Sequence, residues 1–121
     1  MTTPNHRPKP AQFDFRFWIG SDTREQVLRF KIADAPIDIS AYGAVLTIAS
    51  LWRVVLRREI GSGLTIVDGP NGVLKIGPFT AGETRILAST KYELEMRLPD
   101  GTQETWLYGR YIGEGEGINV D

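Results

Sequence analysis

Residues 91–113, KYELEMRLPDGTQETWLYGRYIG, decide the fold of this chain. Apolar and charged side chains alternate over residues 92–98, the period of two that is typical of a half-buried strand. Pro99-Asp100-Gly101 then interrupts the alternation with three residues that favour a turn. Because apolar residues return over residues 104–112, the stretch predicts one long antiparallel hairpin.

Upstream of this hairpin, shorter segments carry the same strand pattern. A helix is the alternative for residues 44–58, but their β-branched residues and period of two favour strands. Glycine-rich and aspartate-containing turns separate the segments. The expected strands are residues 13–19, 27–32, 44–49, 52–59, 64–67 and 73–76.

Residues 81–87 form the one stretch with a helical pattern. Thr80 precedes it and Glu83 follows three residues later, which is the spacing of a capping box. With about eight strands and so little helix, the sequence predicts an all-β sandwich, and a small barrel is the alternative.

A chain of 121 residues predicts one domain with a single core. We expect an extended, proline-rich N-terminal arm over residues 1–11. The β-sandwich domain is expected over residues 12–113, followed by a flexible acidic tail over residues 114–121.

The composition argues against several classes of partner. The net charge of −1 provides no basic footprint for nucleic acid or for an anionic membrane. No apolar run reaches the roughly 20 residues that span a bilayer, and the N-terminus lacks the apolar core of a secretory signal. The chain has no Cys, so its stability must come from packing. We therefore expect neither a nucleic-acid nor a membrane partner.

The sequence also lacks a recognisable reaction centre. His6 is the only histidine, which rules out a histidine-based triad and a multi-histidine metal site. Glu93 and Glu95 alternate with apolar residues, so a solvated strand face is expected for them. The two Asp-Gly pairs fit turns better than calcium loops. The expectation is a non-enzymatic protein with no catalytic residues, no metal ligands and no cofactor.

Candidate interface residues come from the arm and from the aromatic side chains. A frayed terminus is the alternative for the arm, and packing is the alternative for the aromatic residues. The basic residues Arg53, Arg57 and Arg58 are interpreted as a solvated strand edge in preference to a binding patch. The residues expected at an interface are Pro4, Arg7, Pro8, Lys9, Pro10, Trp18, Trp106 and Tyr108.

Several short motifs together resemble a family of phage proteins. They cover most of residues 20–113 and consist of turns and strand starts. The motifs are Pro36-Ile37-Asp38-Ile39-Ser40, residues 63–68 with Asn71-Gly72, Glu83-Thr84, Tyr92-Glu93-Leu94, Asp100-Gly101 and Tyr108-Gly109-Arg110. The order is similar to that of the immunoglobulin-like N-terminal domain of phage baseplate upper proteins and of small virion proteins of tailed phages and prophages.

This resemblance implies an immunoglobulin-like antiparallel β-sandwich of about eight strands. It also implies a structural connector in the virion, present in many copies of a symmetric assembly. The implied partners are other virion proteins of the capsid, neck, tail or baseplate. We expect no fibre or receptor-binding region after the domain, which argues against a fibre-bearing role and leaves a head decoration, a head–tail role or a tail accessory role as the alternatives. The alternative is a stand-alone carbohydrate- or ligand-binding sandwich that uses exposed aromatic residues such as Trp106 or Tyr108.

Overall fold

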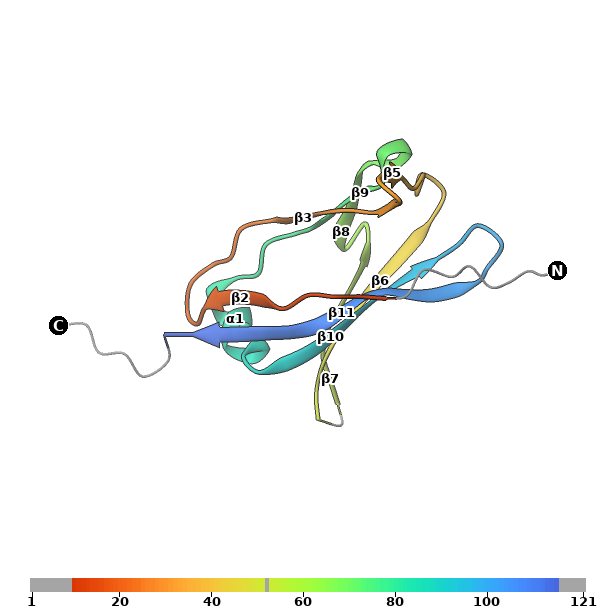
Figure 1. The fold of residues 1–121 in the computed structure, drawn as a ribbon. Coiled ribbons are helices and arrows are strands. Elements are labelled where there is room, and N and C mark those ends of the chain that lie inside the picture. Colours follow the sequence, from red (N-terminus) through yellow and green to blue (C-terminus); the bar gives the residue numbers. More distant parts are fainter. Residues whose placement is uncertain (1–9, 52, 116–121) are drawn as a thin grey trace.

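The computed structural model describes residues 10–51 and 53–115. Nine strands of this part form one curled sheet, and two short strands form a separate hairpin (Figure 1). The strands are β1 (Ala11–Gln12), β2 (Phe15–Trp18), β3 (Gln26–Arg29), β4 (Lys31–Ile32), β5 (Ala35–Pro36), β6 (Gly43–Ser50), β7 (Arg53–Ile60), β8 (Gly63–Asp68), β9 (Val73–Ile76), β10 (Thr90–Arg97) and β11 (Gln103–Glu114). The helices are the 3₁₀ turn η1 (Gly69–Asn71) and α1 (Ala81–Leu87).

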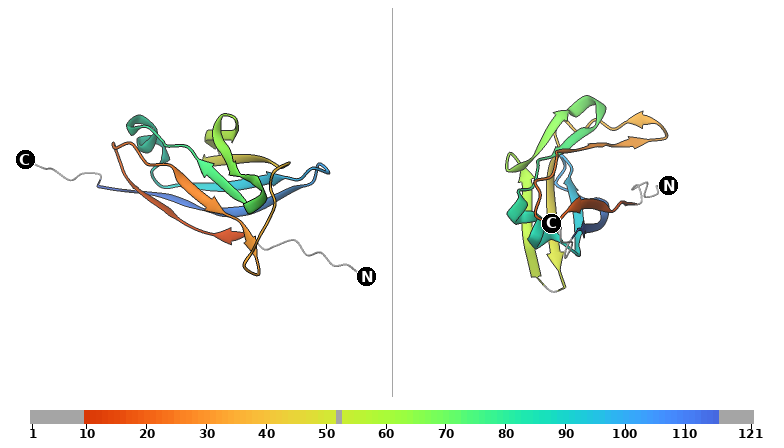
Figure 2. Two further views of the ribbon diagram at one scale, coloured as in Figure 1. Left: turned by 90° about the horizontal axis from the view of Figure 1, so that it is seen from above. Right: turned by 90° about the vertical axis from the view of Figure 1, so that its left-hand side faces the viewer.

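The strand order of the large sheet is β1-β11-β10-β6-β7-β8-β9-β3, and β2 also pairs with β11. The curl folds the sheet over one apolar core (Figure 2). This confirms the prediction of an all-β fold, although there are more strands than the eight expected. The sheet is mixed and not purely antiparallel, because β1 and β2 run parallel to β11 and β7 runs parallel to β8.

The hairpin of β10 and β11 is confirmed and lies inside the sheet, near the β1 end of the strand order. β10 pairs with β6 on its other side, while β11 pairs with β1 and β2. Tyr92, Leu94 and Met96 are buried, as their alternation predicts. Gly101 has a φ of +92° in the connecting turn, a conformation that glycine adopts without strain.

The strand prediction for residues 44–58 is also confirmed. β6 pairs with β7 along most of their length, so the helical alternative is wrong. Farther along the chain, β8 and β9 form the expected hairpin, with η1 in its connection. Helix α1 begins after Thr80, whose side chain accepts from the Glu83 N–H while the Glu83 carboxylate accepts from the Thr80 N–H. The predicted capping box is therefore present.

The first expected strand, residues 13–19, is wrong in its details. Within it only Phe15–Trp18 form a strand, β2, while Phe13 and Asp14 lie between β2 and the preceding short strand β1. The Phe13 N–H donates to the Tyr108 carbonyl oxygen, and Asp14 Oδ1 accepts from the Arg110 N–H. These bonds interrupt the regular ladder with β11, so Phe13 is exposed and does not belong to the core.

Sheet pairing also changes both expected boundaries of the domain. Ala11 lies opposite Leu107 in the β1–β11 ladder, so this last residue of the predicted arm belongs to the sheet. At the other end, Glu114 lies opposite Trp18 in the β2–β11 ladder, so the first residue of the predicted tail belongs to β11. Residues 116–121 lie outside the described part of the chain.

The second expected strand, residues 27–32, is likewise divided. β3 pairs with β9, whereas Ile32 belongs to the small β4–β5 hairpin and is exposed. Ala33 and Asp34, between β4 and β5, both have positive φ values. Two such residues in succession make the tight turn that joins two short strands. The turn takes Ile32 away from the core face predicted for it.

Candidate interaction surface

The two ends of the strand order face each other across an open groove. In the described part of the chain, β3 pairs only with β9, and both β1 and β2 pair only with β11. Each wall of the groove therefore has a strand edge without a partner strand. Unpaired strand edges are ready to bind another extended segment.

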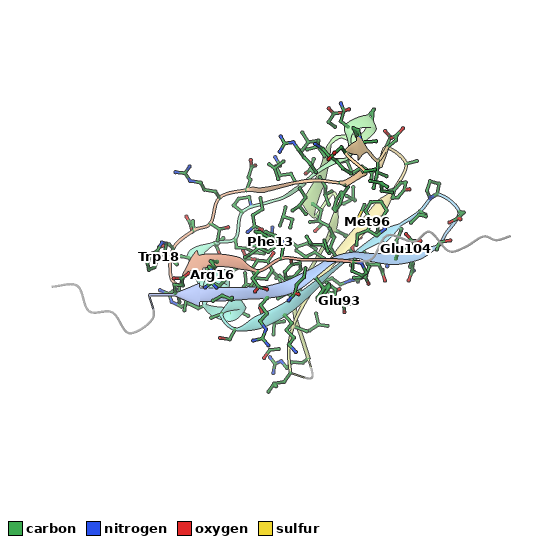
Figure 3. The ribbon with its side chains drawn as sticks, in the orientation of Figure 1. Phe13, Arg16, Trp18, Glu93, Met96 and Glu104 are labelled. Atoms are coloured by element: carbon green, nitrogen blue, oxygen red, sulfur yellow. The ribbon has the colours of Figure 1, made fainter. Side chains whose placement is uncertain are left out.

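The groove has a volume of about 580 Å³ and a mostly apolar lining. Phe13 lies on the β1–β2 side (Figure 3). Val27, which belongs to β3, lines the opposite side. Both side chains are about half exposed, with exposed fractions of 54% and 47%. Exposed apolar side chains on either side of a groove are typical of a surface that another chain covers.

One buried polar atom in this groove has no hydrogen-bond partner within the described residues. It is the Oε1 atom of Gln26, at the start of β3. Gln26 also lines a second pocket of about 340 Å³, next to Trp18 and Tyr111. A buried amide oxygen normally accepts a hydrogen bond, so this atom is an exception among the described residues.

Trp106 corrects one prediction about the site. Its side chain is only 8% exposed, and it packs edge-on against Phe30 and Tyr42 with ring centroids 5.2 and 5.5 Å away. The Trp106 Nε1–H donates to Glu104 Oε1 at 3.0 Å. Trp106 lines the groove from the core side, so the expectation that it is an exposed aromatic residue is wrong.

Trp18 and Tyr108 are the predicted aromatic residues that remain accessible, with exposed fractions of 62% and 41%. Trp18 ends β2 beside Gly115, where an added Cβ would approach the indole ring to 2.8 Å (Figure 3). Tyr108 lies on β11 opposite Gln12 of β1. Trp18 lines the 340 Å³ pocket, not the 580 Å³ groove, so the structure does not bring it together with Trp106.

The predicted arm residues are only partly described. Pro4, Arg7, Pro8 and Lys9 lie outside the described residues, whereas Pro10 is exposed. Pro10 immediately precedes Ala11, which lines the groove. The arm therefore begins at one wall of the groove.

Two tyrosines are buried in the core beneath β1 and β2. Tyr92 Oη donates to the Phe13 carbonyl oxygen at 2.6 Å, and its ring packs against Tyr111 with centroids 5.1 Å apart. Burial raises the pKa of Tyr92, and Asp14 adds to the shift. Burial also raises the pKa of Tyr111, as does Tyr92, while Arg58 opposes the shift. Both hydroxyls therefore stay protonated well above neutral pH, which suits a structural role.

Arg58 does not lie on the solvated strand edge predicted for it. Its guanidinium is 4.2 Å from the centre of the Phe79 ring and donates to the carbonyl oxygens of Gly77 and Pro78. It also pairs with Glu83 of α1 at 3.3 Å. Arg58 thus fastens α1 and the segment before it to β7.

Two aspartates, Asp38 and Asp100, accept hydrogen bonds within turns. Hydrogen bonds from Ser40 lower the pKa of Asp38, and hydrogen bonds from Thr102 lower the pKa of Asp100. Within residues 10–51 and 53–115, no three His, Asp or Glu side chains come together in a way that could hold a metal ion. No helix in the same part of the chain is long and apolar enough to cross a membrane.

Comparison with known proteins gives little further information. The sequence matches no family model and no curated protein. Among solved structures, it is similar to extracellular domains 3–5 of Drosophila OTK, with a TM-score of 0.34 and 12% sequence identity. The alignment covers 85% of this chain and 33% of that structure, so the chain spans about a third of its length. No functional argument is drawn from a similarity this low.

Proposed function

We propose that this protein is a non-enzymatic structural component of a tailed phage particle that binds neighbouring virion proteins. The observation that carries the proposal is the apolar groove between the unpaired edges of β3 and β1–β2. A strand edge offers backbone hydrogen bonds to a partner, and apolar side chains between two such edges add buried area. This combination is suited to binding another protein chain.

The sequence supports the same proposal in two ways. Its short motifs resemble those of connector domains in phage virions, which act by binding other virion proteins. Its proline-rich arm begins at the wall of the groove, where it is in position to contact a neighbouring subunit. The function is therefore assigned to binding surfaces, and no reaction is assigned to the chain.

Carbohydrate binding by an isolated domain is the alternative. Sugar rings stack on exposed aromatic faces, and Trp106 does not provide one. Trp18 and Tyr108 are accessible, so they are the residues on which the alternative depends. Binding of the isolated chain to glycans, lost in Trp18→Ala or Tyr108→Ala, would favour this alternative.

Co-sedimentation with particles tests the virion proposal. Purified protein is mixed with phage particles that lack it, and the bound fraction is measured after centrifugation. We expect the wild-type chain to bind and Val27→Arg, on the β3 wall, to bind less. Val54→Arg is the matched control, because Val54 is 56% exposed on β7 and does not line the groove. Absence of binding by the wild-type chain contradicts the proposal, and equal binding by all three proteins moves the interface away from the groove.

A further inference from the structure

The N-terminal arm has a two-residue period of its own. In residues 1–10, MTTPNHRPKP, the even positions 4, 6, 8 and 10 carry proline or histidine rings, and the odd positions 3, 5, 7 and 9 carry Thr, Asn, Arg and Lys. Successive side chains of an extended strand point to opposite faces. An extended arm would therefore have one face of rings and one polar, cationic face.

The prolines also determine which edge of an extended arm can form hydrogen bonds. Pro4, Pro8 and Pro10 all occupy even positions, so the N–H groups that proline lacks belong to the same edge. The N–H groups of the odd-numbered residues would all point to the opposite edge. This is the arrangement of an edge strand, which pairs on one side and turns its prolines to the other.

The groove suits such a strand in chemistry, and the arm is long enough to cover the β3 wall. The core side chains of Phe15, Phe30 and Trp106 give it an aromatic floor that suits proline rings. The β3 wall, residues 26–30, is about 17 Å long at the rise of a strand, whereas nine extended residues span about 30 Å.

Charge also favours contact between the arm and the rest of the molecule. The whole chain has 14 Lys and Arg against 15 Asp and Glu. Residues 1–9 hold two of the basic side chains, Arg7 and Lys9, and none of the acidic ones, so the remainder has 12 against 15 and a net charge of −3. A cationic arm is therefore attracted to the body of another copy.

The arm is poorly suited to entering its own groove. Because β1 forms one wall, the chain would have to reverse its direction just before Ala11. Arg7 precedes Pro8 and Lys9 precedes Pro10, and a residue before proline is held in an extended conformation. Extended residues at both positions would direct the arm away from its own groove and toward a neighbour.

We infer that the arm of one copy docks as an added strand in the groove of a second copy of this chain. The inference rests on the groove being a docking surface, as proposed above, and does not depend on a place in a virion. Each copy has one arm and one groove, so reciprocal exchange gives a dimer and one-way exchange gives a ring or a filament.

Analytical ultracentrifugation of full-length variants tests this inference without any particle. Val27→Arg blocks the groove, the double variant Pro4→Asp/Pro8→Asp places charges on the ring face of the arm, and Val54→Arg is the control. We expect wild type and Val54→Arg to associate, and each of the other two to associate at least tenfold more weakly. Mixing the groove variant with the arm variant should restore a heterodimer, because one keeps its arm and the other keeps its groove. Circular dichroism verifies that each variant is folded.

A second measurement does not depend on the folding of any variant. A synthetic peptide of residues 1–10 is added to the isotope-labelled wild-type chain, and amide signals are followed by NMR. We expect the peptide to shift the signals of Val27 and Leu28 on β3 and to leave that of Val54 unchanged. A wild-type chain that stays monomeric up to about 1 mM would overturn the inference. Undiminished association of Val27→Arg, no heterodimer on mixing, or no shift on β3 would overturn it equally.

Discussion

At the residue scale, two buried tyrosines allow a matched comparison. Tyr92 Oη donates to the Phe13 carbonyl oxygen, whereas Tyr111 Oη has no hydrogen-bond partner within the described residues. We expect Tyr92→Phe to lower the free energy of unfolding by about 1–2 kcal/mol, because it leaves a carbonyl without its donor. Tyr111→Phe should change it by less than about 0.5 kcal/mol, since no bond is lost. Urea unfolding measures both, and equal losses would contradict the assigned partners.

The same tyrosines predict how stability depends on pH. Burial raises the pKa of both hydroxyls above the ordinary value near 10. The unfolded chain therefore loses these protons first as the pH rises. The stability that the two buried, protonated hydroxyls contribute is complete below about pH 10 and is lost progressively above it. Between pH 8 and pH 11, we expect the Tm of wild type to fall relative to the Tm of Tyr111→Phe, which lacks this titrating hydroxyl. A pH-independent difference would contradict the prediction.

At the element scale, the sequence predicted the segments whose signals are local. The β10–β11 hairpin has a regular alternation on both sides of a proline-containing turn, and the structure confirms it. Helix α1 was predicted from Thr80 and Glu83, whose side chains each accept a hydrogen bond from the other's backbone N–H. In both cases the residues that determine the element lie within a few positions of one another.

The edges of the sheet depend on distant pairing, which the sequence pattern does not contain. The alternation of Phe13, Phe15 and Phe17 predicts three inward side chains, yet the bond between the Phe13 N–H and Tyr108 leaves Phe13 exposed. The groove was missed for the same reason, because its walls come from opposite ends of the strand order. Trp18 and Trp106 both occur in alternating segments, and only the packing around each decides that one is accessible and the other buried.

The break between β1 and β2 depends on Gly109. A Cβ at this position would overlap the Phe13 carbonyl oxygen. We expect Gly109→Ala to cost about 1–3 kcal/mol of stability, the usual effect of overpacking, and to loosen β1 and β2 from β11. Thermal unfolding measures the loss, and hydrogen exchange of β2 amides measures the loosening.

Gly82→Ala is the control for this prediction. Gly82 lies in α1, and a Cβ there would meet only Thr80 Oγ1 at 3.9 Å. Alanine suits a helix better than glycine does, so we expect the control to gain about 0.5–1 kcal/mol. Similar stabilities for the two variants would show that the close approach of Phe13 to β11 is not required.

At the scale of the whole molecule, the curled sheet ends in two unpaired edges on one surface. A sheet that closed fully would leave neither edge available, whereas here both face one apolar groove. Pro10 and Ala11, which follow the proline-rich residues 1–9 in the sequence, lie at the wall of that groove. The proposed binding between subunits rests on this groove and its two edges.

The central claim is that this protein is a structural part of a phage particle, and its presence in purified particles tests the claim most directly. Particles from cells that produce the protein are banded on a density gradient and analysed by quantitative mass spectrometry. We expect peptides of this chain in a constant ratio to the major structural proteins across the particle band. Intact particles without this chain, with all of it remaining in the particle-free fractions, would contradict the claim.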